Sequence, residues 1–185
     1  TFTGRIGIAA PQFGTTRGHL AALLAESGEP ATAAFMQGLK ARGTRIYPGN
    51  GSVVRAVAEG QIDLGFTDSD DVYSGQRNNW PIDIGWVGGL DDQHKGALLI
   101  PNTIGLIRGS TRVVAATQFI EHVLAGEAQE LMARSTSGNI PVLPSLLTRF
   151  PNLRPPVGIG ERSVNWTTTA QSAAKALALW EATFG

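Results

Sequence analysis

The sequence predicts an α/β fold: an open mixed sheet flanked by helices, followed by a helical C-terminal third. Three short apolar runs, at residues 5–9, 45–47 and 62–66, are each followed by a segment with apolar residues at helical spacing. This alternation of strands and helices is typical of a sheet covered by helices on both faces. The chain has 185 residues, of which 42% are hydrophobic, so it can bury a core.

The first strand leads into a helix expected at about residues 17–27. Gly28 ends this helix because glycine favours helix C-termini, and Pro30 suits the first turn of a second helix, which ends at Gly43.

The run at residues 45–47 is expected to be the second strand, and the helix after it can be capped by Asn50 or Ser52 and ends at Gly60. The third strand, residues 62–66, leads into a helix with acidic residues in its first turn, where the helix dipole favours negative charge.

The remaining chain is expected to hold two more strands, at residues 81–87 and 97–100, with extended chain at 103–107. Helices follow at about residues 113–135, and a Pro-rich stretch separates them from a final helix that contains Ala170 and Trp180.

Composition excludes several classes of function. Fifteen basic and fifteen acidic residues give a net charge of zero, which argues against general nucleic-acid binding. The absence of cysteine excludes disulfides, thiolate zinc sites and a cysteine nucleophile. No apolar run of 18 residues is present, so we expect no membrane span.

The sequence also carries no pattern of a familiar catalytic site. The loop around Asn50 lacks the lysine of a nucleotide-binding P-loop. His19 and His122 fall in expected helices without a nearby nucleophile arrangement, so we expect both to be structural or exposed.

Small, hydroxylated or acidic residues stand at three junctions where a strand runs into a helix. In an open α/β sheet such junctions meet at the carboxyl edge, where ligands bind and helix N-termini favour anions. An alternative interpretation is that all three are ordinary helix caps. The candidate ligand-binding residues are Gly14, Thr15, Thr16, Asn50, Asp68 and Ser69.

Asp68, Asp70 and Asp71 form the most distinctive local cluster. Hard cations prefer oxygen ligands, so this cluster can hold a metal ion; acids in a first helical turn are also what the helix dipole favours. A second acidic group, at residues 91–94, is either a metal site or a solvated loop.

Several segments, taken in order, resemble one known family: the periplasmic solute-binding proteins of ABC importers, in the group that includes ferric-ion-binding proteins. The segments that carry the resemblance are residues 4–11, 13–19, 50–54, 60–71 and 100–103, with 119–135 matching the family's late helices. The resemblance implies a type 2 periplasmic binding fold, with two α/β lobes around a cleft. It also implies a non-enzymatic transport role, a periplasmic or extracellular location, and a small solute and an ABC permease as partners.

The resemblance begins midway through the family pattern, so the chain corresponds to a second lobe with the first lobe missing. Residues 1–102 then form that lobe, residues 103–143 are a return segment whose helices normally pack on the first lobe, and residues 144–185 are a Pro-rich connection with the C-terminal helix. Without the first lobe, the apolar face of the helices at residues 112–135 is expected to be exposed and to support self-association.

Carried over to this sequence, the family's anion contacts fall near Gly14 to Thr16, on Asn50 and near Asp68. Its pair of iron-binding tyrosines falls about where Asp70 and Asp71 stand. The nearest phenol is Tyr73, which we include with Asp70 and Asp71 as a candidate metal ligand.

The resemblance implies Fe(III) with an accompanying anion as the bound group. Two carboxylates lack the phenolate oxygens that favour Fe(III), so a different cation, a metal complex or a polar organic solute are alternatives. Two other functions remain open: a Mg-dependent transferase that uses the Asp68 to Asp71 run, and an effector-sensing domain of a regulator.

Overall fold

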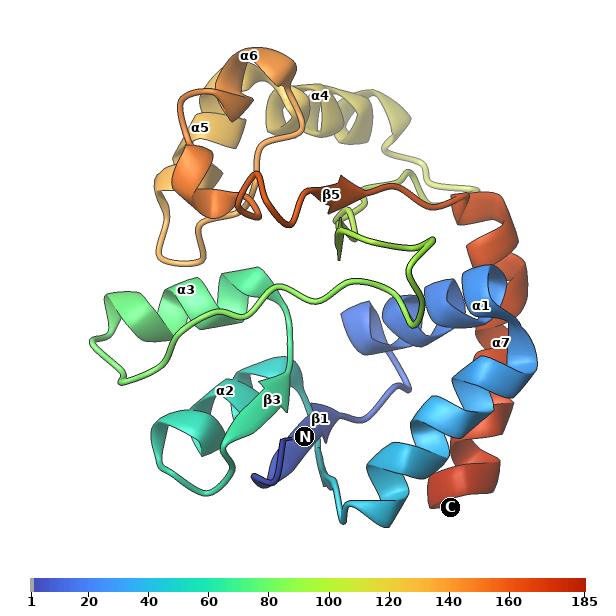
Figure 1. The fold of residues 1–185 in the computed structure, drawn as a ribbon. Coiled ribbons are helices and arrows are strands. Elements are labelled where there is room, and N and C mark those ends of the chain that lie inside the picture. The colour runs from blue at the N-terminus through green and yellow to red at the C-terminus, as the bar shows by residue number, and fades with distance from the viewer. Residues whose placement is uncertain (1) are drawn as a thin grey trace. The chain divides into compact units, whose positions relative to one another are not determined.

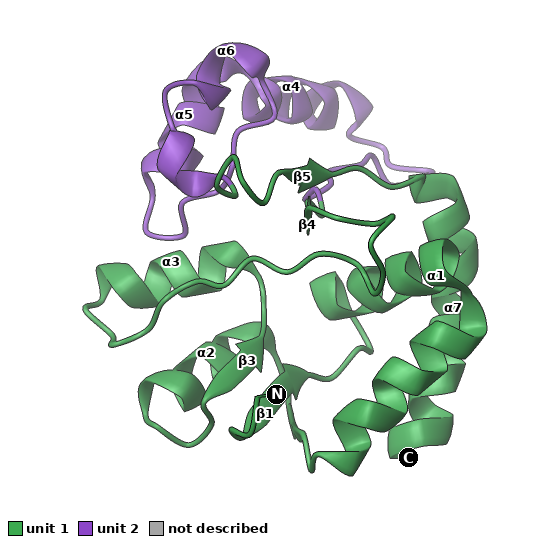
Figure 2. Ribbon diagram, in the orientation of Figure 1, with its two compact units in different colours: residues 1–100, 155–185 green, residues 101–154 purple. Residues whose placement is uncertain are grey.

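The computed structural model describes residues 2–185, which group into two compact units (Figure 2). The first unit contains the chain up to residue 100 together with residues 155–185, and the second contains residues 101–154. None of the helices in the described chain is long and apolar enough to cross a membrane.

The first unit holds the sheets and the longest helices (Figure 1). Its elements, in chain order, are β1 (Ile6–Ala9), α1 (Gly14–Ala41), β2 (Arg45–Tyr47), α2 (Asn50–Ala58), β3 (Leu64–Phe66), α3 (Ser69–Arg77), β4 (Ala97–Leu98), β5 (Glu161–Arg162) and α7 (Trp166–Phe184).

The main sheet has the strand order β2-β1-β3, and both of its ladders are parallel. The central strand places Ile8 opposite Ile46 on one side and Phe66 on the other. The strands β4 and β5 form a separate two-stranded parallel sheet. The predicted α/β class is confirmed, although the described strands pair only in parallel rather than as one mixed sheet.

Helices cover both faces of the central strand. Ile6 and Ile8 pack in a cluster with α1 and α7, whereas Ala9 packs in a second cluster with Val53 of α2 and Ile62. Between them Gly7 permits close packing, because a Cβ at this position would lie 2.4 Å from Cδ1 of Ile62. The three strands are thereby fixed between two helical layers.

The helix α1 contains the break that the sequence predicts. Gly28 has φ 75° and ψ 173°, a backbone conformation that residues other than glycine rarely adopt, and Pro30 follows two residues later. The two halves of α1 are therefore separate helices joined by a kink, which agrees with the prediction of two helices.

The C-terminal helix α7 packs along α1 (Figure 1). Ala176 and Trp180 are buried in the same cluster as Ile6 and Ile8, and the rings of Trp180 and Phe184 stack with centroids 4.1 Å apart. The last twenty residues thus complete the core of the first unit.

The strand predicted at residues 81–87 is wrong: this segment forms no ladder in the structure. Its burial alternates, with Ile82, Ile84 and Trp86 partly buried and the residues between them exposed. The alternating pattern therefore reflects an extended chain that covers one surface without backbone pairing. The expected strand at residues 97–100 is confined to Ala97–Leu98, and residues 103–107 are exposed coil.

The second unit is helical, with α4 (Val113–Leu124), α5 (Gly126–Arg134), α6 (Pro144–Leu147) and the 3-10 helix η1 (Pro151–Leu153). Its organising residue is the buried Gln129, whose amide donates to the carbonyl of Leu124 and accepts from the backbone N–H groups of Val142 and Leu143. These bonds hold the Pro-rich stretch against α5.

Candidate functional site

The three helices that follow the sheet strands begin at the same edge of the sheet. The chain passes from β1 into α1, from β2 into α2 and from β3 into α3, and the strands are parallel. Their carboxyl ends therefore share one edge. The strand order also reverses at β1, and this kind of position is where open α/β sheets bind ligands.

Asn50 connects all three helix starts. Its side-chain Nδ2 donates to Oγ1 of Thr15, at the start of α1, and to Oδ2 of Asp68, before α3, over 2.6 Å in each case. Thr15 in turn donates to Oδ2 of Asp68 over 2.9 Å, and Thr16 donates to Oδ1 of Asn50 over 3.4 Å. The structure thus brings four of the predicted ligand-binding residues into one hydrogen-bonded network.

The prediction that Asn50 or Ser52 caps α2 is wrong. Gly49 occupies the cap position, no side chain caps the helix, and Asn50 is the first helical residue. The side chain of Asn50 is engaged instead by Thr15 and Asp68, residues far away in the sequence. The general preference of asparagine for helix N-caps favours a local cap at this position. In the structure, contacts with residues distant in the sequence take the place of that cap.

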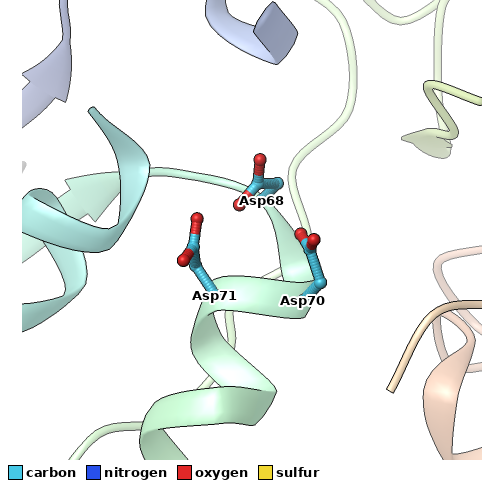
Figure 3. Close-up of side chains that lie close together, drawn as sticks. All are labelled: Asp68, Asp70 and Asp71. Carbon is cyan, nitrogen blue, oxygen red and sulfur yellow. The ribbon is translucent and has the colours of Figure 1, made fainter. Parts of the chain in front are cut away.

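Three carboxylates gather around the first turn of α3 (Figure 3). Asp68, Asp70 and Asp71 each offer an oxygen, and these oxygens lie within 4.8 Å of one another. All three residues are partly buried. Oδ1 of Asp68 is itself buried and has no hydrogen-bond partner in the described structure. The geometry thus brings together the three acids of the cluster that the sequence indicates as able to hold a metal ion.

The closeness of the carboxylates alters their acidity. Burial, followed by the hydrogen bond and negative charge of Asp68, raises the pKa of Asp71 to about 7. Burial and the charge of Asp68 also raise the pKa of Asp70. A cation bound among these groups would relieve the repulsion and favour their ionised forms.

The remaining predicted site residues lie around this cluster in different ways. Tyr73 is buried in α3, and burial raises the pKa of its phenol, so the hydroxyl stays protonated near neutral pH. Gly14 is exposed at the start of α1, and Ser69 is the partly buried first residue of α3. In the described part of the chain, neither Gly14 nor Ser69 forms a hydrogen bond to a member of the Asn50 network.

An open groove of about 610 Å³ lies beside Asp71, between α2 and α3. Gly51 and Arg55 of α2 line one side, and Trp80 lines another. The guanidinium of Arg55 lies over the Trp80 ring, 5.6 Å from its centroid. Sequence reasoning missed Arg55, although its spacing from Gly51 places both on one face of α2.

The acidic loop at residues 91–94 does not form a comparable site. Oδ1 of Asp91 accepts from the backbone of Gln93 and His94 and lies 2.7 Å from Nδ1 of His94, and Asp92 pairs with Lys95. Both carboxylates are thus engaged by partners within the loop. Among the described residues, the group around Asp68 is the one in which three metal-ligating side chains converge.

Comparisons with known proteins agree with this architecture. The sequence pattern of a family described as bacterial extracellular solute-binding protein matches residues 2–153. No curated protein matches the chain.

Two solved structures share the fold. The chain is similar to iron-bound HitA from Pseudomonas aeruginosa, with 21% identity and a TM-score of 0.71, covering 98% of this chain and 57% of that one. It is also similar to a Bordetella ferric binding protein, with 19% identity and a TM-score of 0.59, covering 97% of this chain and 59% of that one. The chain thus spans less than two thirds of either protein.

Proposed function

Because the chain belongs to the family of bacterial extracellular solute-binding proteins, we propose that it captures a small, positively charged solute at the carboxyl edge of its sheet. The periplasmic or extracellular location predicted from the sequence is confirmed by this membership. We further propose that the chain serves an ABC importer, as its solute-binding component or part of one, and delivers the solute to a permease.

The convergence of Asp68, Asp70 and Asp71 at one helical turn is the observation that carries the proposal. Among the described residues, no ion pair joins these carboxylates to a lysine or an arginine. Three partly buried acids held this close together favour a cation.

The solute class follows from the donor atoms. Carboxylate oxygens suit a hard cation or a metal complex, and the two similar structures are iron-bound or ferric-binding proteins by their names. In this chain Asp70 and Asp71 would hold Fe(III) without a phenolate, since Tyr73 is buried and protonated. We therefore favour a hard cation or metal complex, with Fe(III) and an accompanying anion as one member of that class.

The Asn50 network has a positioning role in this proposal. Thr15 and Asn50 donate to Oδ2 of Asp68, which fixes the carboxylate and leaves its Oδ1 to contact the solute. Gly14, Thr16 and Ser69, at the starts of α1 and α3, would contact the remaining polar atoms of the solute.

Native mass spectrometry tests the proposal. The chain is sprayed alone and after addition of Ca²⁺, Fe(III)-citrate or phosphate. We expect a retained metal mass that is lost in Asp70→Ala and kept in Asp92→Ala, an acid-to-alanine control in an exposed loop. An unliganded mass under every condition would contradict a binding site in this chain.

We propose that the chain binds its solute without converting it, since the family to which it belongs is described as solute-binding. A Mg-dependent transferase would use the same carboxylates. Turnover of a phosphorylated or glycosylated substrate, lost in Asp70→Ala, would replace the binding proposal by that alternative.

We also propose that α4 forms an interface between copies of the chain. None of the residues of α4 is buried, and Val114 and Phe119 are 73% and 60% exposed. Apolar side chains gathered on one exposed helix favour association with a partner surface.

A further inference from the structure

Arg162 carries a guanidinium that is buried but only partly paired. The side chain is 5% exposed, and its Nη1 forms an ion pair with Glu26 of α1. Its Nε and Nη2 are also buried, and neither has a hydrogen-bond partner in the described structure. Buried N–H donors in proteins nearly always have a hydrogen-bond acceptor, so two buried donors without one require an explanation.

The glycine-rich loop at residues 88–96 packs against Nη1 of this guanidinium. A Cβ on Gly89 would lie 3.2 Å from Nη1 of Arg162 and 2.9 Å from the carbonyl oxygen of His94, so the loop backbone packs directly against the guanidinium. The loop is fastened to α1 by Ser27, which donates to Asp91 over 3.2 Å. On the loop lies an open groove of about 590 Å³, which Lys95 also lines.

The unpaired edge of Arg162 defines the chemistry of a ligand. Nε–H and Nη2–H of arginine point in parallel and match the two oxygens of a carboxylate or phosphate. We propose that this edge of Arg162 binds the carboxylate or phosphate group of a small anionic ligand, which enters when the loop at residues 88–96 lifts.

This site is distinct from the acidic cluster of α3. It uses the opposite charge and is built from α1, β5 and the loop at residues 88–96. The ion pair with Glu26 occupies Nη1. The two remaining donors, Nε and Nη2, lie side by side and can bind a single oxyanion group.

His19 on α1 provides an internal reporter. Burial, and then the positive charge of Arg162, lower the pKa of His19 to about 4. The other ionisable groups around the site are Glu26, which pairs with Arg162, and the loop residues Asp91, Asp92, His94 and Lys95. An oxyanion bound to Arg162 offsets the charge that acts on His19, so the pKa of His19 should rise on binding.

NMR of the full chain tests the proposal. The Nε–H resonance of Arg162 and the ring resonances of His19 are followed while sodium acetate or phosphate is added, with sodium chloride at equal ionic strength as the control. We expect a saturable shift of the Nε–H resonance with acetate or phosphate but not with chloride, and a higher pKa for His19 at saturation.

Two variants sharpen the test. Arg162→Lys keeps the charge but loses the fork, and should weaken anion binding by about tenfold or more; Arg108→Lys, an exposed control in the second unit, should not change it. Asp70→Ala should also leave it unchanged, which separates this site from the proposed solute site. If Arg162→Lys does not fold, the wild-type Nε–H resonance decides: no saturable shift with either oxyanion would overturn the proposal.

Discussion

The amide of Asn50 donates to the carboxylate of Asp68, with Nδ2 and Oδ2 2.6 Å apart. This bond ties the first turn of α2 to the residue that precedes α3, and the bond from Asn50 to Thr15 adds the start of α1. The carboxylate of Asp68, the first acid of the cluster, is therefore positioned by residues at the starts of α1 and α2.

Replacing Asn50 should disturb both stability and binding. Asn50→Ala removes the hydrogen bonds that Nδ2 donates to Thr15 and to Asp68. Because partly buried polar atoms then lose partners, the unfolding free energy should fall by about 1 to 3 kcal/mol. Solute affinity should fall with it. Asn78→Ala, at the exposed C-terminal end of α3, is the matched control and should change stability less. Equal losses in the two variants, measured by urea unfolding, would show that the network has no special role.

The raised pKa of Asp71 predicts a pH dependence of cation binding. Because the pKa is about 7, the carboxyl is largely protonated in mildly acidic solution and must release its proton to bind a cation. Affinity should therefore rise as the pH increases through about 7, with proton release detectable by calorimetry in buffers of different ionisation enthalpy. Asp71→Asn should weaken binding and remove this part of the pH dependence.

The same shift predicts the opposite trend for the stability of the unliganded protein. A carboxyl whose pKa is raised from 3.8 to about 7 on folding binds more protons in the folded state across that range. The unfolding free energy should therefore fall as the pH rises from about 4 to about 7. Asp71→Asn should flatten the dependence, whereas Asp92→Asn, in an exposed loop, should leave it unchanged. A flat wild-type profile would contradict the packing of the three acids.

The docking of α7 on α1 should dominate the stability of the first unit. Trp180 is 3% exposed, and Trp180→Ala should cost about 3 to 5 kcal/mol. Trp166→Ala, on the same helix, is the matched control; that side chain is 38% exposed and its loss should cost far less. Similar shifts of the urea midpoint in both variants would argue against this packing.

The proposed interface on α4 predicts association that depends on concentration. Val113→Glu places a charge on the exposed apolar side of α4 and should shift the sedimentation profile toward monomer. Val157→Glu, a fully exposed position in the first unit, should not. A wild-type chain that stays monomeric at high concentration would rule out this interface.

Much of the first unit could be predicted from the sequence because its signals are local. The apolar run of β1 and the helix break at Gly28 are each encoded within a few residues of chain. The strand predicted at residues 81–87 failed because alternating burial does not reveal whether a backbone has a pairing partner.

The candidate site was predicted only in part, since its contacts are long-range. The sequence indicates Thr15, Asn50 and Asp68 as separate junction residues but not that one amide joins them. It also favours Tyr73 as a ligand, whereas packing buries that side chain. The ion pair between Glu26 and Arg162 joins residues 136 positions apart, so no local sequence pattern predicts it.

Locating the bound cation tests the proposed solute site at Asp68, Asp70 and Asp71 most directly. Crystals of the chain grown with Tb³⁺, a hard cation with an affinity for carboxylate oxygens, are measured for anomalous scattering. We expect one strong peak enclosed by Asp68, Asp70 and Asp71, and none there in Asp70→Ala. A peak elsewhere in a chain that still binds the ion, or no peak at these carboxylates, would contradict a solute site at this edge of the sheet.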